Sequence, residues 1–237
     1  MSKTTSDAVQ NRVLAALPSR EYERLEPYLK QFEAPQGQIF YQQGDTIDYV
    51  YFPTSGLVSL VTVMQDGASV EVGVVGRLGM VGIPIVLDDN ISPSQAVVQL
   101  AGGVLRLPAK ILQETIEDAG TLRTLLHRFI VARLKQTSQT AACNRNHRID
   151  QRLAYWLLTC QDAVEADRLR LTQEFIAQML GVRRAGVGEA AIELQSRGLI
   201  RYSRGDITIL DRKGLKDFSC ECYGVVSREF QRLLGDL

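Results

Sequence analysis

The spacing of hydrophobic residues changes twice along the first half of the chain. Between residues 7 and 29 apolar positions recur every three or four residues, which predicts two short helices. From 32 to 107, short runs rich in Val, Ile, Tyr and Phe alternate with turn sequences such as QQGD and PTSG, which indicates a β-sandwich or barrel. The clearest hairpin surrounds Asp66-Gly67, because this dipeptide tolerates the left-handed conformation of a tight turn.

Helical spacing returns from about residue 109 to 144, with a broad apolar face. A face this wide needs both the β-domain and a second surface to cover it. Periodicity alone favours packing within the protomer and a seam between two copies about equally. The candidate seam residues are Leu122, Leu126, Phe129, Ile130 and Leu134.

The stretch LTQEFIAQMLGVRRAGVGEAAIELQSRGLI has the residues that a helix-turn-helix requires. Thr172 is suited to cap the first helix, Gly181 to form the turn, and Val187 to anchor the second helix. A hairpin follows around Arg204-Gly205 in GLIRYSRGDITIL, so the predicted unit is a winged helix-turn-helix.

Charge is balanced over the whole chain but not within this unit. Lys and Arg number 27, as do Asp and Glu, so composition alone does not indicate a nucleic-acid partner. Residues 183–216, however, carry eight basic and four acidic side chains, which favours contact with DNA phosphates. No apolar run approaches the roughly 20 residues of a membrane span, and the N-terminus lacks a signal-peptide pattern, so we expect a soluble, cytoplasmic protein without membrane contact.

The four cysteines give little indication of metal chemistry. Cys143 and Cys160 are isolated, and Cys220 and Cys222 form a Cys-x-Cys pair too tight for the usual paired zinc ligands, so we expect no metal site. A redox role of Cys220 and Cys222 stays open. The segment from residue 216 onward has helical spacing and is expected to close the core of the DNA-binding domain.

Together these motifs resemble the Crp/Fnr family of bacterial transcription regulators. GDTIDYVYFPTSGLVSLV is similar to early strands of its jelly roll, residues 122–141 to its dimerisation helix, and RGDITILDRKGL to its wing. The resemblance implies an α+β fold with an effector-sensing β-roll at 1–116, a dimerisation helix at 117–146 and a winged helix-turn-helix at 147–237. It further implies a homodimer on a palindromic site in double-stranded promoter DNA, with RNA polymerase and an unidentified small-molecule effector as further candidate partners.

The resemblance also identifies the residues of the sensor pocket. Cyclic-nucleotide-binding members hold the ribose with a Gly-Glu pair and the phosphate with an Arg before Ser/Thr-Ala. Here Gly82 is kept, Ile83 replaces the Glu, and Ser94-Gln95 replaces Arg-Ser/Thr. Losing a charge-assisted phosphate contact costs about 2–5 kcal/mol, so we expect a degenerate pocket. The alternative is a cyclic-nucleotide-responsive regulator with an atypical pocket.

No cofactor is expected, because the N-terminal cysteine cluster of the iron–sulfur branch has no counterpart before Cys143. Haem-sensing members need an axial ligand, and a core or surface role is the commoner explanation for His127 and His147, the two histidines. A jelly-roll enzyme of the cupin type needs histidines within the barrel, and residues 32–107 contain none, so we expect no enzyme.

DNA-contacting residues follow from the same resemblance. Family readers often carry Arg-Glu-Thr/Ser-Val, and Arg184 matches the Arg, whereas Ala185 and Gly186 replace the next two residues. A bidentate contact from Arg184 to guanine is worth about 1–3 kcal/mol. Glu189 either contacts a base or pairs with an arginine, and glycine at 186 and 188 either lets the helix lie close to DNA or leaves it loosely ordered. Phosphate contacts are assigned to Thr172, Gln173, Arg183, Arg201 and Arg204.

Overall fold

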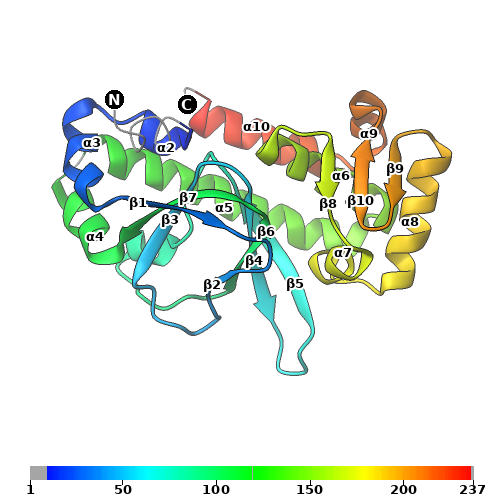
Figure 1. Ribbon diagram of the computed structural model, residues 1–237, viewed down its shortest axis with the longest axis horizontal. Helices are drawn as coiled ribbons and strands as arrows, with labels where there is room; N and C mark the ends of the chain where they lie inside the picture. The colour runs from blue at the N-terminus through cyan, green and yellow to red at the C-terminus, as the bar shows by residue number, and fades with distance from the viewer. Residues whose placement is uncertain (1–9, 119, 236–237) are drawn as a thin grey trace.

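A β-roll and a smaller winged domain lie side by side, and two helices run along both of them (Figure 1). This computed structural model describes residues 10–118 and 120–235. The strands β1–β7 fill one side of the view, while α7, α8 and strands β8–β10 fill the other. Helices α5 (Gly120–Asn146) and α10 (Cys222–Leu234) extend from the β-roll toward the winged domain.

The β-roll consists of two antiparallel sheets, with strand orders β1-β7-β3 and β2-β6-β4-β5. Fully buried Val50 and Phe52 on one strand and Leu105 and Leu107 on another belong to its core. The predicted hairpin is confirmed, since β4 pairs with β5 around Gly67, whose φ is 84°. The strands are β1 Lys30–Ala34, β2 Ile39–Tyr41, β3 Tyr49–Pro53, β4 Leu57–Val63, β5 Ser69–Val75, β6 Gln95–Leu100 and β7 Gly102–Pro108.

Short helices close the ends of the β-roll. The Asn11 side chain accepts a hydrogen bond from the Leu14 amide and donates to the carbonyls of Pro53 and Gly79, so the N-terminal helix is tied to the end of β3 and to the loop after β5. In the described part of the chain, no helix combines the length and apolarity of a membrane span. The helices are α2 Arg12–Ala15, α3 Ser19–Leu25, η1 Glu26–Tyr28, η2 Ile83–Leu87 and α4 Ala109–Asp118.

The long helix α5 buries most of its apolar face within its own protomer. Leu122, Leu126 and Phe129 are 0, 0 and 1% exposed in the core of the β-roll, so these three are wrong as seam residues. Ile130 is half-buried against the same core, whereas Leu134 is 64% exposed. A different stripe faces outward with the three- and four-residue steps of a heptad, made of Thr124, His127, Val131, Leu134, Ser138 and Ala141.

The winged domain combines four helices, α6 to α9, with a small antiparallel sheet of order β8-β10-β9. Ile176, Val187, Leu194 and Ile207 are fully buried in its core. Strand β8 was not expected from the sequence, because three residues are too few to show alternation. The elements are α6 Ile149–Val164, β8 Arg168–Arg170, α7 Gln173–Leu180, α8 Arg184–Ser196, β9 Ile200–Ser203, β10 Asp206–Ile209 and α9 Arg212–Phe218.

Helix α10 does not simply close the winged domain, and that expectation was wrong. Its first turn contributes Tyr223 to the winged core, but Phe230, Leu233 and Leu234 pack against the core of the β-roll and α5. Figure 1 shows α10 lying along α5. Its apolar stripe covers a part of α5 that the β-roll leaves open, so the C-terminal helix joins the two domains.

Glu71 of β5 is buried where the β-roll meets α6. Its carboxylate accepts a hydrogen bond from Trp156 Nε1 at 3.1 Å, and its other oxygen lies 2.6 Å from Ser59 Oγ. Ser59 Oγ is also 2.5 Å from Gln99 Oε1, which only accepts. A hydroxyl carries a single proton, so both contacts are satisfied together when Glu71 is protonated. Burial accordingly raises the pKa of Glu71 to about 7.

Replacing Glu71 by glutamine should change the pH dependence of stability. A pKa raised from 4.5 means that the stability due to Glu71 is full below about pH 4.5 and is lost as pH rises through 7. This single group makes the wild-type protein about 2–3 kcal/mol less stable at pH 8 than at pH 5. Glutamine imitates the protonated carboxyl, so the variant should gain that much on the wild type over the same range, as measured by urea unfolding at each pH.

The comparison isolates Glu71 because its charged neighbours are unchanged in the variant. Burial lowers the pKa of Arg133 on α5 to about 10, and burial raises the pKa of Tyr155 and of Cys160 on α6, so none of these three titrates between pH 5 and 8. Parallel stability curves for the two proteins would show that Glu71 is ionised in the folded state throughout.

Candidate nucleic-acid interface

Helices α7 and α8 form the predicted helix-turn-helix. Thr172 caps α7, with its Oγ1 accepting a hydrogen bond from the Phe175 amide at 3.2 Å. Gly181 ends α7 with φ of 62°, a left-handed conformation that favours glycine. Val187 on α8 is fully buried, as its role of anchor requires. Local chemistry therefore fixes both the turn and the face of α8 that points away from the domain.

The structure brings together two of the predicted contact residues. Gln173 is the first residue of α7 and Arg184 is the first residue of α8. Arg184 Nε donates to Gln173 Oε1 at 3.4 Å, a contact that leaves the two Nη groups out of the bond. Arg183 precedes the helix as its N-cap residue, and both arginines are exposed. The outer edge of the turn therefore carries two cations beside the positive end of the α8 dipole.

The wing adds two more exposed cations. Arg204 and Gly205 form the tight turn between β9 and β10 with φ values of 50° and 84°. Arg201 lies on β9 and is exposed like Arg204. The hydroxyl of Tyr202 donates to the carbonyl of Leu171 at 2.9 Å, so the wing is held against the residue that precedes the Thr172 cap.

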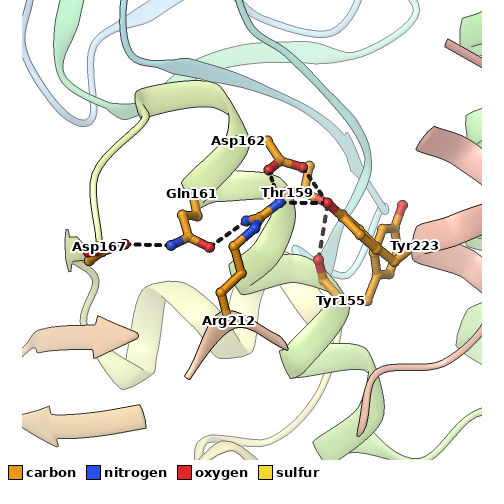
Figure 2. Close-up of polar contacts among 7 residues, drawn as sticks. All are labelled: Tyr155, Thr159, Gln161, Asp162, Asp167, Arg212 and Tyr223. Atoms are coloured by element: carbon orange, nitrogen blue, oxygen red, sulfur yellow. Dashed lines mark hydrogen bonds and ion pairs between the residues drawn. The ribbon is translucent and has the colours of Figure 1, made fainter. Parts of the chain in front are cut away.

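Arg212, another basic residue of this region, has structural partners. Arg212 Nη2 donates to Asp162 at 2.6 Å and to the Tyr223 hydroxyl at 2.9 Å, and that hydroxyl donates to the second oxygen of Asp162 at 2.8 Å (Figure 2). Gln161 donates to Asp167 in the same network. These contacts fasten α9 and the start of α10 to α6. Arg212 therefore contributes to the domain's structure, and the local excess of basic residues overstates the charge available to DNA.

The two glycines of α8 have different surroundings. A Cβ atom on Gly186 would lie 3.0 Å from Ile149 Cδ1, closer than most real contacts, so Gly186 lets α8 approach α6. Neither explanation offered from the sequence included this packing role. A Cβ atom on Gly188 would lie 3.8 Å from Gln173 Nε2, an ordinary contact, so helix packing does not require glycine there.

The outer face of α8 carries a residue that the sequence analysis missed. Ala185, Glu189 and Ile192 follow at steps of four and three residues, and all are exposed. Ile192 is 66% exposed, which is unusual for a large apolar side chain. Among the described residues no ion pair involves Glu189, although Glu193 one turn later pairs with Arg197. The sequence did contain an indication of this, because Ile192 is a large apolar residue that is not among the positions predicted to face the core of the domain.

The positions of the predicted sensor pocket hold no charged group. Gly82 adopts φ of 110° and directly precedes η2. The first residue of η2, Ile83, packs against the β-roll core. Ser94 is buried, with its carbonyl accepting a bond from Ser92 Oγ at 2.5 Å. Gln95 Nε2 donates to Gln42 Oε1 across the sheet. Backbone, hydroxyl and amide groups here satisfy one another.

A separate cavity of about 350 Å³ lies between the β-roll, α6 and α10. Its lining includes Gly76 and Arg77 beyond β5, Tyr155 on α6, and Tyr223 and Phe230 on α10. None of the four predicted pocket residues lines it.

Two domain families match this chain. The cyclic nucleotide-binding domain matches residues 31–119, and the Crp-like helix-turn-helix domain matches residues 151–218. The two matches follow the β-roll and the winged domain of the structure.

Several characterised proteins are similar over most of the chain. The CRP-like cAMP-activated global transcriptional regulator of Mycobacterium tuberculosis is 26% identical over 194 residues, covering 79% of this chain and 87% of that protein. The transcriptional regulatory protein btr of Bordetella pertussis is 25% identical over 220 residues, covering 86% and 87%. A CRP/FNR-family transcriptional regulator from Thermus thermophilus shares the fold with a TM-score of 0.66 at 22% identity, covering 80% and 98%. With a cyclic-nucleotide-binding-type β-roll joined to a Crp-like DNA-binding domain, the chain belongs to the Crp/Fnr family of transcription regulators.

Proposed function

We propose that this protein is a homodimeric regulator that binds a palindromic promoter site and reads it with Arg184. The observation that carries the proposal is the placement of Arg184, exposed on the first turn of α8 and steadied by Gln173. Because only Nε takes part in the bond to Gln173, both Nη groups are left for other contacts, and a bidentate contact to guanine O6 and N7 uses such groups. Second helices of this motif contact bases with their N-terminal residues.

The surrounding groups suit the DNA backbone. Arg183 beside the recognition helix and Arg201 and Arg204 on the wing are exposed cations, as phosphate contacts require. Thr172 and Gln173 lie at the N-terminus of α7, where free amides and the helix dipole attract an anion. On the outer face, Ile192 offers an apolar surface for a thymine methyl group, and Glu189 offers an acceptor for cytosine.

Homodimer formation is assigned to the exposed stripe of α5. Crp/Fnr regulators are typically dimeric. The stripe from Thr124 to Ala141 has heptad spacing, with Val131 and Leu134 exposed at its centre and small side chains at Ser138 and Ala141. Two copies packed along this stripe would bury the apolar surface that each leaves open.

The effector, if the β-roll takes one, is not a cyclic nucleotide in this proposal. The Mycobacterium tuberculosis relative is described as cAMP-activated, so a cyclic-nucleotide-responsive regulator is the second candidate. Against it stands the absence of any charged side chain among Gly82, Ile83, Ser94 and Gln95. A cyclic phosphate bound there would lose its counter-charge.

Selection of genomic fragments on the full-length protein tests both candidates. We expect a palindromic motif whose half-sites lie about one DNA turn apart, recovered equally with and without cyclic AMP. Enrichment only in the presence of cyclic AMP would favour the second candidate. Recovery of fragments with no shared motif would contradict sequence-specific reading.

A further inference from the structure

Four potential metal ligands from distant parts of the chain meet at one point. Cys143 lies in the last turn of α5, and His147 follows directly after that helix. Cys220 lies between α9 and α10, and Cys222 is the first residue of α10. One ligand atom from each of these residues lies within 4.8 Å of all the others. The three cysteines are at most 3% exposed, and all are free thiols.

The separations fit a shell of ligands around one ion. Cys143 Sγ and Cys220 Sγ are 3.6 Å apart, and Cys222 Sγ is 3.4 Å from His147 Nδ1. A tetrahedral zinc ion, with Zn–S of about 2.3 Å and Zn–N of about 2.0 Å, separates its ligands by about 3.8 Å between sulfurs and about 3.5 Å between sulfur and nitrogen. A disulfide would instead bring two sulfurs to about 2.05 Å.

The neighbours of these residues suit metal ligation as well. His147 Nε2 lies 3.1 Å from Glu221 Oε2, so the carboxylate holds the ring with Nδ1 facing the cysteines. Metal-bound histidines typically donate their other ring N–H to such a partner. Gln139 Nε2 donates to Cys222 Sγ at 3.1 Å, a bond that favours a thiolate.

We propose that Cys143, His147, Cys220 and Cys222 bind a structural zinc ion. Three thiolates and one imidazole complete a closed tetrahedral site of the Cys₃His type. An iron–sulfur cluster fits less well, because its ligands bind different irons and stand farther apart than four atoms gathered around one ion. The ion would join the corner between α5 and α6 to the start of α10, and so fix the winged domain against the long helix.

This proposal revises the expectation of no metal site. By itself the Cys-x-Cys pair does not indicate zinc, because its spacing is too tight for the usual paired ligands. Two further ligands come from 73 or more residues earlier in the chain, and only the contact of α10 with α5 brings them into reach. Tyr223, bonded to Asp162 and Arg212, holds the first turn of α10 on α6 next to Cys222 (Figure 2).

The full-length protein, expressed in zinc-supplemented medium and purified without chelators, should contain about one zinc per chain by elemental analysis. The Cys220→Ser variant should lose most of this metal. Cys160→Ser is the matched control, because Cys160 is an equally buried thiol outside the cluster, and it should keep the metal.

The spectrum of the cobalt-substituted wild-type protein is a readout that needs no variant to fold. Wild-type protein expressed in cobalt-supplemented medium should show the visible bands of tetrahedral Co²⁺ and strong thiolate-to-metal charge transfer in the near ultraviolet. In Cys220→Ser, any residual charge transfer should fall by at least about one third, because one of three thiolates is gone. The proposal would be overturned if the purified protein contained no zinc and the cobalt-grown protein showed no tetrahedral spectrum. Iron in place of zinc would also overturn it, as would an equal loss of metal in Cys160→Ser.

Discussion

Replacing Leu134 by glutamate should convert the proposed dimer into a monomer and abolish tight binding to the proposed palindromic site. Leu134 is 64% exposed in the protomer, so the change leaves the core intact and acts on the association alone. In the proposed dimer, a carboxylate at the centre of the stripe would face its own copy across the two-fold axis, and two like charges would be buried together. Molar mass from light scattering should therefore halve.

DNA affinity should fall with the loss of the dimer. A dimer that has bound one half-site holds its second reading helix near the other half-site at high effective concentration. Losing that link weakens binding by about 10²–10⁴-fold. Titration of a labelled palindrome with each protein measures the effect. Binding to a single half-site should change little, which separates lost pairing from a damaged reader.

Met64→Glu is the matched control for this prediction. Met64 is 58% exposed in the turn of the β4–β5 hairpin, so the substitution makes a similar apolar-to-acidic change outside α5. This variant should remain dimeric and bind as the wild type does. If Leu134→Glu also kept the dimeric mass, the seam would have to lie on another surface.

The long helix α5 shows where sequence periodicity stops being informative. Helical spacing correctly indicated a helix with an unusually broad apolar face, but not which part of that face packs on the β-roll. Leu122, Leu126 and Phe129 are large apolar residues, and they are buried in the core of the same protomer. The exposed stripe is less apolar, with Thr124, His127 and Ser138 among its members, so composition alone gave it little weight.

Local features were predictable because a few neighbouring residues determine them. The Thr172 cap, the left-handed Gly181 and the hairpin turns at Gly67 and Gly205 all depend on contacts within a few residues. The thiol cluster, the burial of Glu71 and the course of α10 depend on packing between segments that lie far apart in sequence. No pattern within one segment encodes those contacts.

Replacing Arg184 by alanine should remove most of the sequence specificity of the dimer. In the proposed complex each copy of Arg184 would supply a bidentate guanine contact worth about 1–3 kcal/mol, and two copies would act on a palindrome. The expected loss is therefore about 2–6 kcal/mol, or roughly 30-fold to 10⁴-fold in affinity for the selected site. Affinity for unrelated DNA should fall much less, because phosphate contacts dominate non-specific binding.

Two further arginine variants distinguish base reading from simple loss of charge. Arg204→Ala removes a wing cation and should weaken binding to all sequences alike, with a shallower dependence on salt. Arg228→Ala removes an exposed cation from α10, outside the helix-turn-helix and the wing, and should leave binding unchanged.

Base substitution supplies the sharpest test of Arg184. In wild-type protein, changing the guanine that each Arg184 contacts, in both half-sites, should cost as much affinity as the alanine substitution, because the same two contacts are lost from either side. In Arg184→Ala the same base change should cost almost nothing, since the partner is already gone. Full sensitivity to that base in the variant would assign its reading to another residue, with Glu189 or Ile192 on the outer face of α8 next to be tested.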